Sequence, residues 1–577
     1  MTKGQGVSSL TRRELMGLGA SAAAGLLCEG CGRPGDTRHD GLQVLEVKWL
    51  HKALNGRNTK LRSYNGRVPG PMVSAHPGET LRIRLKNSLT PYDSTGWPGN
   101  PNVPHDLNST NLHVHGLDVA PHLFQPQGTA DPKAPMIHVM PGETFDYKFE
   151  LPTDHPPGLY WYHAHAHGST AVQGVSGMAG AIVVRGDIDE VPEIKAARDI
   201  VLVIQDIGLF PSETEPGVWT YEPQQNAVWV SVSAPQIGVS AGKIYKWDPK
   251  GAHFVEQPAL KSGFTTGDYP LRFFLLSIAS DGRTLEDAQP FFQETHVTAS
   301  GNTNNPDPTQ LRTQEIRMAP GEVVRFRMLN ACSDNLMPIV VEGHEMHLVA
   351  LDGVNFPAPR TIPVYAGESG DGQVLLAPAN RAEFLIQAGK PGRYAIRELA
   401  HRQGFLPSAG KVIAEILVDG PAKSMTLPRT LPTVSRYYPL IEKVNGANAL
   451  QFAVGPAKLN PYIGVDFTIN GTQYQEDQVD PGNVVALGDA QEWTLTNDHA
   501  HGGTEGHPFH IHMNHFEVIS VGGVAQPPGT IQDTVWVPVD KPVVIRMRFR
   551  QFRGKSVFHC HILPHEDTGM MRNFLVR

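Results

Sequence analysis

The sequence predicts an all-β protein built from repeated sandwich domains. Its 577 residues include 58 Gly and 48 Pro, which favour many turns, and long segments with helical periodicity are scarce after the N-terminus. A Pro-Gly-Glu turn followed by alternating apolar residues recurs at residues 77–87, 141–149 and 320–330, and a weaker copy begins at Pro481. Each copy is typical of a turn that leads into a strand with one buried face, so the repetition indicates duplicated domains.

The N-terminal region is typical of an export signal. Arg12-Arg13 precedes a weakly apolar run from Leu15 to Leu27, which is too short to span a bilayer. Paired arginines at this place predict a twin-arginine (Tat) signal, the Tat export machinery as a partner, and a periplasmic or secreted protein. Lipid anchoring through Cys28 or Cys31 is the alternative, although neither cysteine follows a good lipidation motif. No later segment is apolar for long enough to cross a membrane, so we expect a soluble mature chain.

Two linker-like stretches, residues 186–197 and residues 419–435, predict the domain boundaries. The first is acidic and follows a predicted strand, whereas the second is rich in proline. The long middle segment is expected to hold an insertion between Pro211 and Thr309. The predicted parts are a signal region over residues 1–36 and three domains over residues 41–186, 197–420 and 436–577.

The charge of the chain excludes one class of partner. The formal net charge is -8 at pH 7, the isoelectric point is near 6.4, and no basic stripe is evident. A nucleic-acid partner is therefore not expected. We expect the mature chain to act as a monomer.

The stretch around Cys560 concentrates metal-ligand side chains. It follows an apolar, alternating segment and is predicted to be a strand, so His559 and His561 face one side and Cys560 faces the other. A cysteine between two histidines can then serve two metal sites. His565 and Met570 follow beyond a turn and can fold back onto the sulfur. Two histidines, a cysteine thiolate and a weak axial methionine form the ligand set of a blue-copper site.

Histidine pairs recur elsewhere in the chain. His113-Val114-His115, His163-Ala164-His165 and His510-Ile511-His512 share the spacing of two with the pair that flanks Cys560. On a strand both rings of a pair face one side, with their Cα atoms about 6.5 Å apart. Eight converging histidines would supply three metals with two or three imidazoles each, at an interface between the first and third domains. His507 lies three residues before the third pair, and the proline between lets the strand enter with His507 directed to a different site, so His507 supplies the second histidine of the mononuclear site.

These blocks resemble the signature of the multicopper oxidases, and the similarity covers nearly the whole mature chain. The resemblance is to the three-domain, laccase-like bacterial type, in which each domain is a cupredoxin-like Greek-key β-sandwich. It implies four copper ions, namely one type 1, one type 2 and two type 3. The same resemblance implies that His113 and His510 are the type 2 ligands, and that His507, Cys560, His565 and Met570 are the type 1 ligands. It implies His115, His163 and His561 as ligands of one type 3 copper, and His165, His512 and His559 as ligands of the other.

The resemblance implies a reaction and leaves the reductant open. A reducing substrate would be oxidised one electron at a time at the type 1 site, and dioxygen would be reduced to water by four electrons at the trinuclear site. A laccase-like oxidase of phenolic or aromatic substrates is the first hypothesis. A metallo-oxidase of Cu(I), Mn(II) or Fe(II) in metal tolerance is the alternative, although no methionine-rich insert appears among the 15 Met. A copper-free structural relative would have lost ligands, and none is lost.

Two acids are candidate catalytic residues, because oxygen reduction consumes protons. Glu566, directly after His565, resembles a family acid that feeds protons to the cluster. Asp131 is a possible second acid, although the surrounding loop departs from the better-known laccase pattern. Pro564 is a further departure, since many relatives carry an acid there.

Several other residues compete with this ligand set. Met571 is a rival of Met570 for the axial position, but the spacing of ten residues from Cys560 favours Met570. The remaining histidines near the pairs are interpreted as neighbours of the site or surface residues, and they are His167, His499, His501 and His515.

Overall fold

The computed structural model describes most of the chain from residue 38 onward. No helix within this described part is long and apolar enough to cross a membrane. The predicted signal over residues 1–36, with Cys28 and Cys31, lies outside the described residues and stays a prediction. The described residues are 38–577 except 40, 95–96, 222–226, 231–237, 241–242, 249, 252, 261–269, 296–306, 368–370, 404–405, 457, 461, 464 and 502–504.

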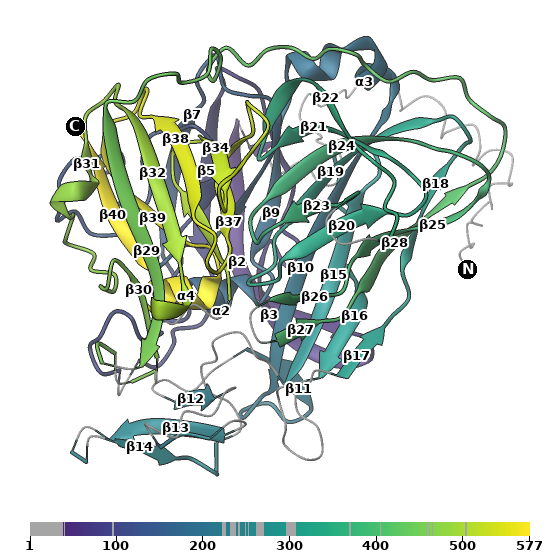
Figure 1. Ribbon diagram of the computed structural model, residues 1–577. Helices are drawn as coiled ribbons and strands as arrows, with labels where there is room; N and C mark the ends of the chain where they lie inside the picture. The colour runs from purple at the N-terminus through teal and green to yellow at the C-terminus, as the bar shows by residue number, and fades with distance from the viewer. Residues whose placement is uncertain are drawn as a thin grey trace, which may run out of the picture.

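The predicted all-β fold is confirmed, because strands form almost all of the regular structure and the helices are short (Figure 1). In Figure 1 the C-terminal strands, in green and yellow, lie at the left, and the middle strands, in teal, lie at the right. The helical turns are α2 (Thr170–Gly174), η1 (Asp187–Glu190), α3 (Pro192–Ala196), η3 (Pro481–Asn483), η4 (His499–His501) and α4 (Leu563–Asp567).

The first sandwich packs two sheets around one apolar core. Val47 and Ile83 from one sheet meet Val114 and Tyr162 from the other in that core. One sheet holds β1 (Arg38–His39), β2 (Leu42–Leu54), β3 (Arg57–Tyr64), β5 (Thr80–Asn87) and β7 (Thr144–Glu150), and the other holds β4 (Val73–Ala75), β6 (His113–His115), β8 (Gly158–His163) and β9 (Ala179–Val184).

The middle sandwich has the largest core, in which Phe326 and Phe384 of one sheet meet Ile339 and Ile416 of the other. Its first sheet holds β10 (Arg198–Pro211), β15 (Leu271–Ala279), β16 (Gln289–Thr295), β17 (Asp307–Gln310), β19 (Val323–Asn330), β21 (Met346–Leu351), β22 (Val354–Ile362) and β24 (Arg381–Gln387). Its second sheet holds β18 (Gln314–Met318), β20 (Met337–Val341), β23 (Val374–Leu376), β25 (Gly392–Glu398) and β28 (Lys411–Val418), and a small hairpin holds β26 (His401–Gln403) and β27 (Leu406–Ser408).

The third sandwich surrounds an apolar core that contains Cys560 and Met570. One sheet holds β29 (Gly446–Pro456), β30 (Val465–Ile469), β32 (Ala490–Asn497), β34 (Phe516–Val521), β35 (Val524–Ala525), β36 (Ile531–Gln532) and β38 (Val543–Arg548). The other holds β31 (Val484–Val485), β33 (His507–Ile511), β37 (Thr534–Val537), β39 (Gly554–Cys560) and β40 (Met571–Val576).

The same strand arrangement recurs in all three sandwiches. The strand after the recurrent turn lies parallel to the first long strand, as β5 does on β2, β19 on β10 and β32 on β29. Each of these strands ends at a buried asparagine, Asn87, Asn330 or Asn497, whose side-chain amide donates to two backbone carbonyls of neighbouring loops or strand ends. These hydrogen bonds explain why an asparagine ends each of these three strands.

The weaker copy of the pattern, which begins at Pro481, does not lead into the expected strand. Pro481 opens the short helix η3, which leads into β31 rather than into β32. The turn before β32 is closed by Asp489, whose carboxylate accepts the Ala486 amide at 3.0 Å. Glu322 does the same before β19, accepting the Ala319 amide at 2.8 Å. Asp489, in a turn without proline, thus closes the turn before the strand as the glutamate of Pro-Gly-Glu does, and the Pro-Gly-Glu pattern does not detect this turn.

The insertion of the middle segment joins two sandwiches into one continuous sheet. Strand β11 (Val218–Thr220) pairs with β10 on one side and with β3 of the first sandwich on the other. The result is a sheet of 14 strands that spans both sandwiches. A separate small sheet of β12 (Ala227–Val230), β13 (Lys243–Asp248) and β14 (His253–Glu256) lies at the bottom of Figure 1.

Truncation of Phe384 is expected to destabilise the middle sandwich strongly. Phe384 is 1% exposed and its ring stacks on that of Phe326 at 5.7 Å, so Phe384→Ala leaves a cavity between the sheets. The free energy of unfolding should fall by about 3–5 kcal/mol. Denaturant unfolding followed by circular dichroism measures it, with Leu375→Ala as the control because Leu375 is 45% exposed. Equal effects of both substitutions would contradict this packing.

Candidate metal centre

Strand pairing brings the four histidine pairs to one place. Strands β6 and β8 pair with His113 opposite His163, and strands β33 and β39 pair with His510 opposite His559. The first pair of strands belongs to the first sandwich and the second pair to the third. All eight histidines are buried, and we call them the histidine cluster: His113, His115, His163, His165, His510, His512, His559 and His561.

Rings from the two sandwiches stack on each other within the histidine cluster. The ring of His113 stacks on that of His512 with centroids 3.9 Å apart, and the ring of His115 stacks on that of His510 at 3.8 Å. The Nε2 atom of His559 lies 3.1 Å from Nε2 of His165 and 3.2 Å from Nε2 of His512. The cluster therefore lies between the first and third sandwiches.

The histidine cluster has the chemistry of a metal site. In His113, His163 and His510 the Nδ1 atom is held by a hydrogen-bond partner inside the protein, whereas the buried Nε2 atom has none. Burial lowers the pKa of these imidazoles, that of His163 to about 3, which keeps them in the neutral form that binds metals. One anchored nitrogen and one open nitrogen per ring is the arrangement of a metal-ligating histidine, so the residues fit bound copper.

Within the histidine cluster, geometry groups one predicted ligand set together and mixes members of the other sets. Ligand atoms of His165, His512 and His559, assigned together by resemblance, lie within 4.8 Å of one another. The same distance also groups His113 with His115 and His163, and His113 with His510 and His512, across the assigned sets. Within the described residues, His561 belongs to no such group, but its ring centroid lies 5.0 Å from that of His115 and 5.3 Å from that of His163.

A second site surrounds the sulfur of Cys560 on the other side of β39. The Nδ1 atoms of His507 and His565 lie 3.5 Å and 3.8 Å from Cys560 Sγ, and all three residues are buried. Burial raises the pKa of the Cys560 thiol well above its usual value. Metal binding must therefore displace a proton from this sulfur, as it does in thiolate sites generally.

The two candidate methionines lie in different apolar clusters. Met570 is fully buried and belongs to the same apolar core as Cys560, and its backbone carbonyl accepts the Cys560 amide at 3.0 Å. Met571 points into a different apolar cluster, which it shares with Val557 and Phe124. The structure thus places Met570, and not Met571, on the side of the sulfur.

The outer face of His565 is covered by two residues that the sequence did not single out. Its Nε2 atom lies 3.3 Å from a carboxylate oxygen of Glu505, and the ring of Phe467 stacks on it at 4.2 Å. The His565 side chain is only 3% exposed. No spacing pattern marks Glu505, which is brought here by the loop between β32 and β33.

The two candidate acids have different positions. Glu566 is fully buried, and its two carboxylate oxygens lie 3.2 Å from Nδ1 of His165 and 3.1 Å from Nδ1 of His559. Asp131 is exposed, and its carboxylate accepts the Lys133 amide at 2.9 Å in its own surface turn. Asp131 therefore lies on the surface, in a turn exposed to solvent, and its role as a second acid stays a prediction. A different acid, Asp533, contacts the cluster, with Oδ1 3.0 Å from Nε2 of His115.

The remaining histidines divide between interior and surface. His499 is exposed and pairs with Asp540. His167 is buried with Nε2 3.1 Å from Asn102 Oδ1, and His515 is buried beside Asp118. Burial opposes charging of His515, but its hydrogen bond to Asp118 and the nearby carboxylates raise its pKa above the usual value.

Helix α4 ties the mononuclear site to the first sandwich. Pro564 occupies the first turn of this helix and is buried. Asp567, at its end, accepts the backbone amides of Gly168 at 2.8 Å and Ala171 at 2.7 Å, which lie in and before α2. The segment that carries His565 and Glu566 is thereby fixed from both sandwiches.

The fold and the two sites together define an all-β copper redox protein, in which a Cys-His₂ site and a histidine cluster share adjacent residues of one strand. Comparisons with known proteins lead to the same class. Profiles described as multicopper oxidase match residues 46–188, 277–406 and 448–577. The chain belongs to the multicopper oxidase family. It is a copper-dependent oxidoreductase that uses oxygen and a reducing substrate.

Individual relatives cover nearly the whole chain at low identity. A laccase from Bacillus stratosphericus is 23% identical over 546 residues, which are 89% of this chain and 90% of the laccase. A solved multicopper oxidase from Campylobacter jejuni, described as a metallo-oxidase, matches with a TM-score of 0.61 and 22% identity, over 94% and 93% of the two chains. The laccase-like oxidase CueO from Ochrobactrum sp., described as active on lignin model compounds, matches with a TM-score of 0.62 and 21% identity, over 94% and 98%. The three sandwiches are thus cupredoxin-like domains.

Proposed function

We propose that this chain is a laccase-like oxidase of phenolic or aromatic substrates, with one type 1, one type 2 and two type 3 coppers. The coppers supply one-electron oxidation of the substrate and four-electron reduction of dioxygen to water. One observation carries the proposal: Cys560 belongs to the mononuclear site, and its two chain neighbours, His559 and His561, belong to the histidine cluster. The peptide backbone between them is a short covalent route for electrons.

Protein side chains have distinct tasks in this reaction. A phenol that gives up one electron also loses a proton, and Glu505 beside His565 is placed to accept it. Glu566, held between His165 and His559, is placed to deliver protons where oxygen is reduced. Burial of the cluster excludes bulk water, which makes a positioned acid necessary.

A metallo-oxidase is the second candidate, and Glu505 is the observation that favours it. A carboxylate 3.3 Å from the outer nitrogen of His565 suits a cation such as Cu(I), Fe(II) or Mn(II) as well as a phenol. The relative from Campylobacter jejuni is described as a metallo-oxidase.

Oxygen consumption by the copper-loaded protein separates the two candidates. We expect turnover with methoxyphenols to exceed turnover with Cu(I), Fe(II) and Mn(II). Glu505→Gln should raise the KM for a metal ion, because the cation binds the charge of the carboxylate. For a methoxyphenol it should instead lower kcat with little change in KM, because the amide cannot accept the proton. Glu492→Gln is the matched control, because Glu492 pairs with Arg546 instead. A preference for one metal ion would replace the phenol proposal, and no turnover with any donor, despite four coppers per chain, would refute both.

A further inference from the structure

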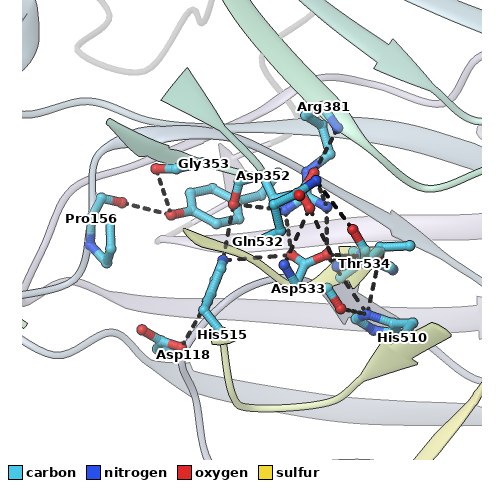
Figure 2. A network of polar contacts seen from close by, with 12 residues as sticks. Asp118, Pro156, Asp352, Gly353, Arg381, His510, His515, Gln532, Asp533 and Thr534 are labelled. Carbon is cyan, nitrogen blue, oxygen red and sulfur yellow. Dashed lines mark hydrogen bonds and ion pairs between the residues drawn. The ribbon is translucent and has the colours of Figure 1, made fainter. Parts of the chain in front are cut away.

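The middle sandwich contacts the histidine cluster although it contributes none of its histidines. Arg381, the first residue of β24, is fully buried and holds the carboxylate of Asp533 with both terminal nitrogens, at 2.9 Å and 2.5 Å (Figure 2). Its Nε atom donates to the Leu159 carbonyl of the first sandwich at 3.2 Å. A single guanidinium thus joins all three sandwiches.

Asp533 in turn contacts two histidines of the cluster. Its Oδ1 atom lies 3.0 Å from Nε2 of His115, and its backbone carbonyl accepts a hydrogen bond from Nδ1 of His510 at 2.9 Å. The Thr534 hydroxyl donates to Asp533 Oδ1 at 2.8 Å and lies 3.2 Å from Nδ1 of His510. Because Nε2 of His115 is engaged, only its Nδ1 atom remains for a metal, and this buried atom has no partner within the protein.

The surroundings hold the Arg381–Asp533 pair in one geometry. The buried carboxylate of Asp352 accepts the backbone amides of Arg381 at 2.8 Å and of Asp533 at 3.1 Å. Gly116, directly after His115, has a φ of +83°, and a Cβ atom there would collide with both Arg381 Nη2 and Asp533 Oδ2. The strand that carries His115 can approach the pair this closely only with glycine at that position.

Charge also favours one arrangement of Asp533. The Arg381 guanidinium donates to both oxygens of this carboxylate, and the opposite charges hold it in place. His515 approaches the other oxygen, with Nε2 3.5 Å from Asp533 Oδ2, and it lies between this oxygen and Asp118 (Figure 2). An ionised carboxylate of fixed orientation selects the tautomer and the rotation of a histidine ring that donates to it.

We propose that Arg381 is a positioning residue for the trinuclear site: by fixing the Asp533 carboxylate, it orients His115 and His510 toward their metals. The middle sandwich, which supplies no ligand to the cluster, thereby controls how tightly the cluster binds copper. The inference rests on the proposed trinuclear function of the histidine cluster. The Cys560 site contacts neither residue of the pair and should not depend on it.

Arg381→Lys tests this inference because it keeps the charge and removes the two-pronged contact. Copper affinity of the histidine cluster should fall by about 10–100-fold. The type 2 electron paramagnetic resonance signal and the type 3 near-ultraviolet absorption should be lost at copper concentrations that fill the wild type. The blue absorption of the Cys560 site should be retained in the same sample.

Two further variants keep the test decisive. Arg327→Lys is the matched control, because Arg327 is an equally buried arginine of the middle sandwich whose carboxylate partners are Asp189, Asp199 and Glu383 rather than Asp533. The cluster signals of this variant should persist. Thr534→Val, which conserves volume, should weaken the type 2 signal even if Arg381→Lys does not fold.

Each outcome has a distinct meaning. Cluster signals unchanged in Arg381→Lys and Thr534→Val would overturn the inference, as would a parallel loss of the blue and cluster signals in a folded Arg381→Lys protein. A wild-type protein that binds copper without any type 2 or type 3 signal would instead overturn the proposed function.

Discussion

Replacing Cys560 by serine is expected to abolish the blue absorption of the copper-loaded protein and to reduce oxygen turnover to the level of the copper-free chain. Cys560 Sγ is the sulfur that lies between His507 and His565, and a hydroxyl cannot supply the thiolate bond on which that absorption depends. Serine is smaller than cysteine, so β39 should keep its pairing with β33. The histidine cluster should therefore stay largely filled.

A matched substitution separates the chemistry of the thiol from the cost of a buried hydroxyl. Cys332 is the second buried free cysteine of the described chain and lies in the core of the middle sandwich. Cys332→Ser should lower stability but leave the blue absorption and the turnover per copper unchanged. Blue colour retained in Cys560→Ser, or lost in Cys332→Ser, would refute the assignment of the type 1 site. Absorption spectroscopy with copper analysis measures both.

Replacing Glu566 by glutamine is expected to lower oxygen turnover by about 100-fold or more, the usual contribution of a positioned acid. Its carboxylate lies within 3.2 Å of two cluster histidines in a site without exposed surface, so no solvent group can take its place. Glutamine keeps the size and the polar contacts but cannot donate and regain a proton. Substrate oxidation at the Cys560 site does not involve this residue and should remain fast.

The two half-reactions can be measured separately. Rapid mixing with a phenol under anaerobic conditions should bleach the blue band of Glu566→Gln at the wild-type rate, whereas oxygen consumption should be slow. Asp131→Asn is the matched control and should change neither, because Asp131 is exposed in a surface turn. Slow bleaching, or normal oxygen consumption, in Glu566→Gln would contradict a role in proton delivery.

The ligands were predictable because their spacing is a local property. A spacing of two places both histidines of a pair on one side of a strand, and the alternation around Cys560 divides its neighbours between two sites. Glu566 was predicted from the family resemblance, as the acid directly after His565, with which it shares helix α4. The repeated Asn87, Asn330 and Asn497 likewise indicate that the corresponding strands end at the same place in each sandwich.

Contacts that depend on how the sandwiches pack were not predictable. Arg381 and Asp533 are 152 residues apart, and Asp533 and His115 are 418 apart, so no pattern in the chain links them. The position of Asp131 was not predictable either, because whether its loop faces the cluster or the solvent depends on tertiary packing, and the structure has it exposed. The continuous sheet through β11 was missed because a three-residue strand carries too little periodicity to be recognised.

By itself the sequence determined the all-β class and the grouping of the histidine pairs, because side-chain alternation along a strand converts spacing directly into direction. Its family resemblance predicted copper as the metal and the individual ligands. The tertiary structure alone revealed that Asp533 contacts the histidine cluster, that Glu505 lies beside His565, and that Arg381 of the middle sandwich holds Asp533. These features depend on how the sandwiches pack against each other, and the free energy of that packing comes from many buried contacts between residues that lie far apart in the chain.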